Sequence, residues 1–218
     1  QGNAHGELRG EWLMFLIGVL VSGGGTNLQA IIDRIEDGYL QNCMITSVVS
    51  SREGAYALER ARRHGIPAFC MPRRSYDDTD LYGKALAEHF QAEQAELIVL
   101  AGFMTVLGDS FLRAFENRII NVHPSLIPAF CGKGMYGLRV HEAALARGVK
   151  VTGATVHFVN EIPDGGEILL QKAVEIAPDD TPETLQRRVM EQAEWQLLPL
   201  AAERVCAEIV REKEQKND

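Results

Sequence analysis

An unbroken apolar run covers residues 13–21 and leads directly into the stretch Ser-Gly-Gly-Gly-Thr-Asn at residues 22–27. A run of this kind is typical of a strand buried on both faces, as in a parallel sheet with helices on each side. Apolar residues at helical spacing follow from 28 to 35. The order strand, glycine loop and helix therefore constrains the chain to an α/β fold.

The alternation continues along the chain and predicts a doubly wound, mostly parallel sheet in a single domain. Residues 1–11 are polar and patternless, so we expect an N-terminal extension, disordered or added for expression, before one domain at 12–218. We expect the last helix, which opens at Thr181 and Pro182, to be interrupted at Pro199. Further strands are expected at 44–49, 68–71, 97–101, around 120–122, at 149–159 and at 168–176, and further helices at 55–64, 77–94, 109–115 and through 141 to about 147.

Composition narrows the function classes. With 218 residues, of which 46% are hydrophobic, the chain can bury a sizeable core. Lys and Arg number 22 against 30 Asp and Glu, and the net charge of −8 argues against a nucleic-acid surface. No apolar run is long enough for a membrane span, and no secretory signal is visible. We expect a soluble cytoplasmic monomer or homodimer that acts on small molecules.

The four cysteines are far apart and form no C-x-x-C pair, so free thiols are the simplest expectation. The histidines other than His123 (His5, His64, His89, His141 and His157) have no acidic or cysteine partners at ligand spacing. The sequence therefore predicts no metal site.

The glycine loop at residues 22–27 suits a phosphate. Glycines allow close backbone approach, and Thr26 or Asn27 can cap the following helix, whose free N–H groups attract anions. The loop lacks the Lys-Ser/Thr ending of a Walker motif, and Leu28 stands where a dinucleotide fingerprint has its third glycine. A phosphate without a dinucleotide is favoured, and a tight turn that binds nothing is the alternative.

Asn121 and His123 form the second candidate site. Ile120 and Val122 indicate the end of a buried strand, because Pro124 follows at once. Side chains two apart lie on one face, so the amide and the imidazole point together into the crevice at a strand exit. Such a pair can stabilise an oxyanion and move a proton. The alternative is a histidine whose ring simply bonds a backbone carbonyl.

Other features have ordinary interpretations. The apolar loop at residues 103–108 either lines a pocket for a flat ligand or is core beneath the next helix. Asp164 in Pro-Asp-Gly is by default a turn residue. Arg73 and Arg74 are by default a solvated pair, and Glu191 and Glu194 solvated helix carboxylates.

Four stretches together resemble the folate-dependent glycinamide ribonucleotide formyltransferase family of purine synthesis. The Asn-x-His-Pro-Ser motif with a downstream Asp-Gly-Gly is typical of formyl-folate enzymes, and the glycine loop narrows the resemblance to this family. The stretches lie at residues 21–31, 100–104, 120–128, and 156–159 followed by 164–166.

The resemblance implies a Rossmann-like formyltransferase fold and assigns roles to individual residues. Asn121, His123 and Asp164 would be catalytic. The ribonucleotide would be held at its phosphate by Gly25, Thr26 and Asn27 and near its amine or ribose by Glu194. The co-substrate 10-formyltetrahydrofolate would contact Met104, Thr105, Val106, Leu107, Asn121 and Thr79.

The chain departs from the family pattern at three points. Thr79 stands where the family often has a basic residue, the spacing before Glu194 is one residue longer than usual, and the loop at residues 131–137 is longer than in compact members. Methionyl-tRNA formyltransferase and formyltetrahydrofolate deformylase share the motif, but the former carries an added C-terminal domain and the latter an N-terminal regulatory domain. A phosphosugar-sensing domain that uses the glycine loop alone is the non-enzymatic alternative.

The chemistry implied requires no metal and no covalent enzyme intermediate. An amine attacks the formyl carbon, an oxyanion forms, and protons leave the amine and reach the folate leaving group. Asn121 would donate to the oxyanion. His123 would be held in its imidazolium form by Asp164 and would relay the proton, because a carboxylate beside an imidazole favours the charged ring.

Overall fold

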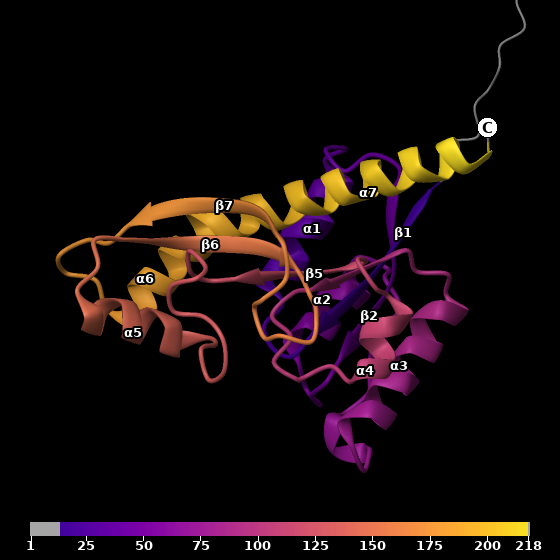
Figure 1. Cartoon of the computed structure of the whole chain (residues 1–218), viewed down its shortest axis with the longest axis horizontal. Coiled ribbons are helices and arrows are strands. Elements are labelled where there is room, and N and C mark those ends of the chain that lie inside the picture. Colours follow the sequence, from indigo (N-terminus) through magenta and orange to yellow (C-terminus); the bar gives the residue numbers. More distant parts are fainter. Residues whose placement is uncertain (1–13, 218) are drawn as a thin grey trace, which may run out of the picture.

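The computed structural model describes residues 14–217, and its framework is a seven-stranded sheet in the order β3-β2-β1-β4-β5-β6-β7 (Figure 1). The five strands from β3 to β5 pair in parallel, whereas β6 pairs antiparallel with both β5 and β7. The predicted mostly parallel α/β sheet is confirmed. The strands are β1 (Phe15–Val21), β2 (Cys43–Ser50), β3 (Ala68–Cys70), β4 (Leu97–Leu100), β5 (Ile119–His123), β6 (Val151–Phe158) and β7 (Ile168–Glu175).

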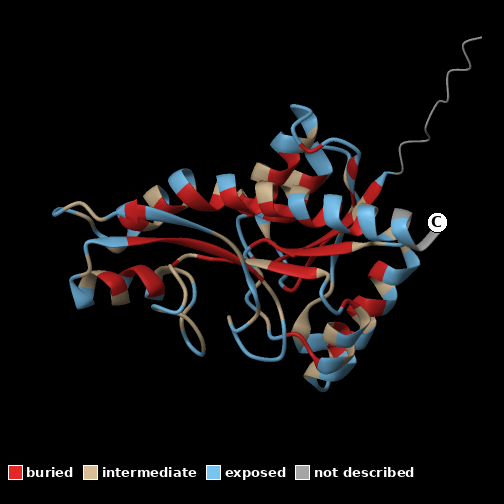
Figure 2. Ribbon diagram, turned by 45° about the horizontal axis from the view of Figure 1, so that its top comes forward, coloured by how far each residue is buried: buried red, intermediate tan, exposed pale blue. Residues whose placement is uncertain are grey.

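Helices cover both faces of the sheet (Figure 2). Their buried sides face the strands and their exposed sides face solvent, as expected of amphipathic helices. They are α1 (Thr26–Glu36), α2 (Tyr56–Arg63), the 3₁₀ turn η1 (Arg73–Ser75), α3 (Thr79–Ala92), α4 (Asp109–Ala114), α5 (Leu138–Arg147), α6 (Pro182–Val189), the π-helical turn η2 (Met190–Glu194) and α7 (Trp195–Asn217).

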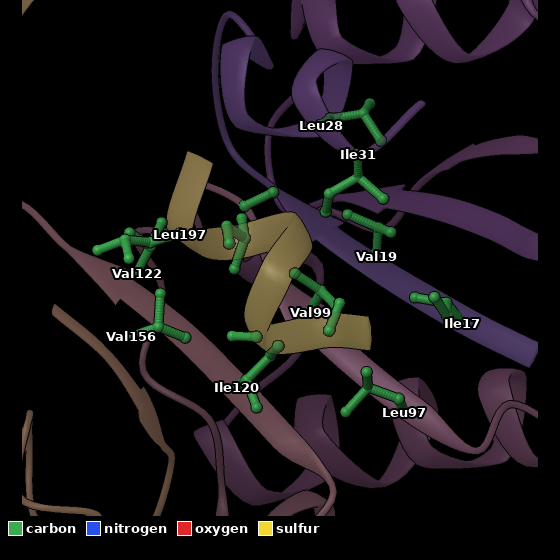
Figure 3. Close-up of a cluster of buried hydrophobic side chains, with 14 of the residues drawn as sticks. Ile17, Val19, Leu28, Ile31, Leu97, Val99, Ile120, Val122, Val156 and Leu197 are labelled. Atoms are coloured by element: carbon green, nitrogen blue, oxygen red, sulfur yellow. The ribbon is translucent and has the colours of Figure 1, made fainter. Parts of the chain in front are cut away.

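Two apolar clusters form the core, one on each face of the sheet. Val19 belongs to the cluster that also contains Leu28 and Ile31 of α1 and Leu197 of α7 (Figure 3). Its neighbour Leu20 points the other way and packs with Phe90 and other residues of α3 and α4. Because successive strand residues face opposite sides, both must be apolar, which explains the unbroken run in β1. Each such buried side chain stabilises the fold by roughly 1.5–3 kcal/mol.

The parallel arrangement places the carboxyl ends of β1, β4 and β5 at the same edge of the sheet. The glycine loop follows β1, and the apolar loop follows β4. The Ser22 amide donates to Gly102 O at 3.1 Å, and the Met104 amide donates to Ser22 Oγ at 2.9 Å, so the two loops are joined. Ligand sites of open α/β sheets lie at this edge.

The C-terminal helices differ from the expectation. The chain does not break at Pro199, because α7 runs from Trp195 through this proline, so the predicted interruption there is wrong. The irregularity lies earlier, in the π-helical turn η2. Pro199 follows shortly after this turn and lies inside the helix that continues from it.

Three findings concern the other predictions. The predicted extension at residues 1–11 and the start of the predicted domain at residue 12 lie outside the described residues. Cys43, Cys70, Cys131 and Cys206 are free thiols, as expected. Within residues 14–217 no helix is both long and apolar enough to cross a membrane.

Candidate active site

The structure brings Asn121, His123 and Asp164 together at the end of β5 and adds a fourth residue, His157. His123 Nδ1 lies 3.5 Å from Asp164 Oδ2, and His157 Nε2 lies 3.6 Å from Asp164 Oδ1. We call these four residues the polar cluster. Its members come from β5, from β6 and from the turn between β6 and β7, so the antiparallel addition of β6 to the parallel sheet assembles the cluster.

His157 was overlooked by the sequence analysis, which placed it in a strand without a partner. It stands directly opposite Asn121 in the antiparallel register of β5 and β6. His157 Nδ1 donates to Phe158 O at 2.7 Å, and His157 Nε2 lies 3.2 Å from Asn121 Nδ2. The carbonyl bond places a proton on Nδ1, and Nε2 lies within hydrogen-bond distance of the Asn121 amide, so His157 orients that amide.

Asp164 is both a turn residue and a member of the polar cluster. Its backbone has φ 55°, in the left-handed region, and the Gly132 amide donates to its Oδ2 at 2.8 Å. Burial raises the pKa of Asp164, but the bond from His157, the Gly132 amide and the charge of His123 together outweigh it, so the pKa lies below its ordinary value. Asp164 is therefore a stable carboxylate at neutral pH.

His123 is 4% exposed, and both of its ring nitrogens have neighbours. Nε2 donates to Phe130 O at 2.9 Å, while Nδ1 faces Asp164. The alternative interpretation, a histidine bonded to a backbone carbonyl, thus holds together with the predicted carboxylate pair. Phe130 has φ 51°, a strained backbone for a residue with a side chain, which is common at functional sites.

His141 is a third buried histidine, close to the polar cluster. It lies on α5, and both ring nitrogens lack a hydrogen-bond partner among the described residues. Burial, together with repulsion from His123, lowers the pKa of His141 to about 4. His141 therefore stays neutral at physiological pH.

The glycine loop contacts the C-terminal segment through its side chains. Asn27 Nδ2 donates to Glu194 Oε2 at 2.7 Å, and Thr26 Oγ1 donates to Met190 Sδ at 3.7 Å. The expected cap by Thr26 or Asn27 is absent, because Gly25, with φ 74°, is the N-cap of α1 and has no side-chain bond. The backbone amides at the start of α1 are the groups left to bind an anion.

Glu194 is buried, with 6% of its surface exposed, so the default interpretation as a solvated carboxylate is wrong; Glu191 is exposed as expected. Burial raises the pKa of Glu194 to about 7, although the bond from Asn27 opposes this shift. Glu194 closes the π-helical turn η2. The longer spacing expected before Glu194 stays a prediction.

The apolar loop contains both exposed and buried residues. Met104 and Val106 are exposed, Val106 to 74%, whereas Leu107 is buried in the core, and Thr105 is half-buried. Exposed apolar side chains gathered at a strand exit are typical of a binding surface. The core alternative is thus confirmed for Leu107, and a binding role for Met104 and Val106 stays a prediction.

Thr79 begins α3 beside the apolar loop, since a Cβ on Gly108 would lie 2.6 Å from Thr79 O. Arg73 Nη2 donates to Thr79 Oγ1 at 3.2 Å, and Nη1 donates to Tyr76 O at 2.7 Å. Arg73 is thus held in place and is not a freely solvated side chain. Its neighbour Arg74 is exposed and paired with Glu53 at 2.7 Å.

Metal ligands and cavities add two observations. Within the described part of the chain, no three histidine, cysteine or carboxylate side chains are grouped to hold a metal. A cavity of about 430 Å³ lies next to the glycine loop and is bordered by Thr26, Arg60 and Glu191. A cavity of about 520 Å³ near Cys43 and His64 involves none of the predicted site residues.

Comparisons with known proteins give matches over most of the chain. The family model described as "Formyl transferase" matches residues 16–202. The chain is 40% identical over 184 residues to phosphoribosylglycinamide formyltransferase of Haemophilus influenzae, covering 84% of each protein. It is 36% identical over 199 residues to the chloroplastic phosphoribosylglycinamide formyltransferase of Arabidopsis thaliana, covering 91% of this chain and 68% of that protein.

The solved structures give the same result. The crystal structure of glycinamide ribonucleotide transformylase 1 from Symbiobacterium toebii has a TM-score of 0.81 and 46% identity, covering 86% of this chain and 85% of that one. Some curated relatives are much longer, and the chain spans between 13% and 61% of three of them.

Proposed function

The chain belongs to the phosphoribosylglycinamide formyltransferase family, and on this premise we propose that it transfers the formyl group of 10-formyltetrahydrofolate to the amine of 5'-phosphoribosylglycinamide in purine biosynthesis. The observation that carries the proposal is the polar cluster, in which Asn121, His123 and Asp164 meet beside an exposed apolar loop. The expected cytoplasmic location, the absence of a metal and the expected monomer or homodimer stay predictions.

The ribonucleotide is held on the side of the glycine loop. Amides at Gly25, Thr26 and Asn27 bind its phosphate at the start of α1, where the helix end is positive. Asn27 Oδ1 is buried without a partner among the described residues, beside the buried carboxyl of Glu194. Two acceptors in one place suit a ligand that brings donors, here the ribose hydroxyls or the amine.

The folate is held on the side of the apolar loop. Met104 through Leu107 and Asn121 contact the pterin, and Thr79 lies where the tail leaves the site. The positive charge that Thr79 lacks comes from Arg73, whose guanidinium is bonded to the Thr79 hydroxyl. A guanidinium matches the carboxylates of the glutamate tail through paired hydrogen bonds.

The transfer needs one bond formed, one broken and one proton moved. The neutral amine attacks the formyl carbon. The tetrahedral oxyanion that forms accepts a hydrogen bond from the Asn121 amide, which is oriented by His157. The oxyanion also replaces the Phe130 carbonyl as acceptor of the His123 Nε2 proton. The carbon to folate-nitrogen bond then breaks, and His123, supported by Asp164, relays the amine proton to the departing nitrogen.

The proposal is tested by incubating the purified protein with both substrates and measuring formylated ribonucleotide and free tetrahydrofolate. We expect the two products in equal amounts and little tetrahydrofolate when the ribonucleotide is omitted. Release of formate without the ribonucleotide would instead indicate a deformylase. Binding of the ribonucleotide without any transfer would indicate a sensing domain.

A further inference from the structure

The glycine loop rests on the first two turns of α2. Gly23 O accepts from the Ala57 amide at 3.0 Å, Gly24 O accepts from Arg60 Nε at 2.8 Å, and Gly25 O accepts from the Gln29 amide at 2.9 Å. All three carbonyls are thus bonded to α1 or α2. In a planar trans peptide the N–H points opposite to the C=O, so the loop turns its amides away from these helices.

Of these three donors, Arg60 alone uses its side chain. Arg60 Nη1 also donates to Gln29 Oε1 at 3.2 Å, and the guanidinium carbon lies 5.0 Å from the centre of the Tyr56 ring. Three contacts therefore fix the guanidinium, and such a stacked, hydrogen-bonded site requires the planar group of arginine. The Gly24–Gly25 peptide is oriented by a side chain that sequence patterns do not connect to the loop.

The charges around Arg60 add to its effect. The cavity of about 430 Å³ beside Thr26 is lined by Asp33, Asp37 and Glu191 as well as by Arg34 and Arg60. Carboxylates already outnumber guanidiniums among these side chains, so loss of Arg60 makes their balance more negative, which would repel a phosphate at the start of α1.

We propose that Arg60 is a positioning residue for the ribonucleotide phosphate: its bond to Gly24 O turns the Gly25 amide toward the anion, and its charge offsets the neighbouring carboxylates. This inference rests on the proposed function, because it identifies the anion as the substrate phosphate. Arg60 bonds the side of the loop that faces α2 and takes no part in the formyl transfer itself.

The test compares Arg60→Met and Arg60→Lys with Arg63→Met as the matched control. Arg63 lies on the same helix and stacks on the same Tyr56 ring at 5.6 Å, but it bonds Glu59 and the Tyr56 hydroxyl instead of the glycine loop. The measurements are KM and kcat for the ribonucleotide, calorimetry with ribose 5-phosphate, calorimetry with a folate analogue, and thermal unfolding.

For Arg60→Met we expect KM for the ribonucleotide and Kd for ribose 5-phosphate to rise about tenfold, as for one lost charge-assisted hydrogen bond, with kcat within about twofold. Folate affinity should not change. Arg60→Lys should recover part of the loss, and Arg63→Met should behave as the wild type.

Unchanged ribose 5-phosphate affinity in Arg60→Met overturns the proposal, as does an equal loss in Arg63→Met or an equal loss of folate affinity. If the wild type binds ribose 5-phosphate but transfers no formyl group, the proposed function fails while calorimetry still decides the role of Arg60. If the wild type transfers the formyl group but does not bind ribose 5-phosphate, the role of Arg60 fails while the proposed function stands.

Discussion

The polar cluster and the glycine loop lie at the same edge of the sheet, yet they present different groups to a ligand. In the polar cluster the side chains of Asn121, His123 and Asp164 are the groups proposed to act on the substrates, and each is oriented by another side chain or by a backbone bond. In the glycine loop the side chains of Thr26 and Asn27 face the C-terminal segment, and the backbone amides remain for the ligand.

The difference teaches where a substitution should act. A site made of side chains depends on their chemical identity, so changes there should lower kcat. A site made of backbone amides depends on loop geometry and on what packs behind it, so changes there should weaken binding of one substrate. The substitutions of Asp164, Gly25 and Arg73 described below test this division between kcat and binding.

The largest effect is expected for Asp164→Asn in the polar cluster. Asparagine tolerates the left-handed backbone at φ 55° and should preserve the turn, but it removes the charge that faces His123. We expect kcat to fall by at least about a hundredfold with little change in KM for the ribonucleotide. Steady-state kinetics with a thermal melt as folding control would show it, and near-normal kcat would remove Asp164 from the mechanism.

The next effect concerns the pH dependence of stability and Glu194. Because burial raises the pKa of Glu194 from 4.5 to about 7, the folded state binds more protons than the unfolded state between these values. The contribution is fully present below pH 4.5 and is lost as the pH rises through about 7. Glu194→Gln keeps an acceptor for Asn27 but cannot ionise.

We therefore expect the free energy of unfolding of the wild type, relative to Glu194→Gln, to fall by on the order of 2 kcal/mol between pH 5 and pH 8. Urea unfolding of both proteins across this range measures the difference. Parallel pH curves for the two proteins would mean that Glu194 ionises as an ordinary exposed carboxylate.

A smaller effect is expected for Gly25→Val in the glycine loop. Gly25 has φ 74°, and a Cβ there would lie 2.6 Å from Ala57 Cβ and 2.8 Å from Ala57 Cα, so valine strains the loop and displaces α2. We expect ribonucleotide affinity to fall tenfold or more and stability to fall by about 1–3 kcal/mol, while a folate analogue still binds normally. Calorimetry with each ligand separately measures the two affinities. An equal loss of both in a folded variant would contradict the division between kcat and binding.

The smallest effect is expected for Arg73→Met, with Arg74→Met as its control. Arg73 is anchored at Thr79 beside the apolar loop, whereas Arg74 pairs with Glu53 at the surface. We expect Arg73→Met to raise KM for a folate with a glutamate tail about fivefold, and Arg74→Met to have almost no effect. A folate analogue that lacks the tail should not discriminate between the variants, and equal effects in both would locate the tail elsewhere.

Much of the fold could be predicted because each strand exit and helix is marked locally. The strand expected at 97–101 is β4, Leu97–Leu100, and its continuous apolar sequence follows from burial on both faces. Pro199, by contrast, predicted a break that the structure does not have. The π-helical turn η2, which precedes α7, was not predicted.

The polar cluster was predictable only in part. Asn121 and His123 share a strand face, which the alternation in sequence reveals. His157 was missed because its role arises from the register of β5 and β6, which pairs it with Asn121 across the sheet. Asp164 looks like a turn residue because it is one, and its placement beside two histidines depends on folding of distant segments.

The most direct test is a single-turnover experiment with both substrates saturating, comparing the wild type with His123→Ala and Asn121→Ala. The account predicts that the rate of formyl transfer falls by about a hundredfold or more in each variant, while the Kd values of the ribonucleotide and of a folate analogue stay within a few-fold of the wild type. A transfer rate equal to that of the wild type in either variant, with the protein folded, would contradict the claim that the polar cluster performs the reaction.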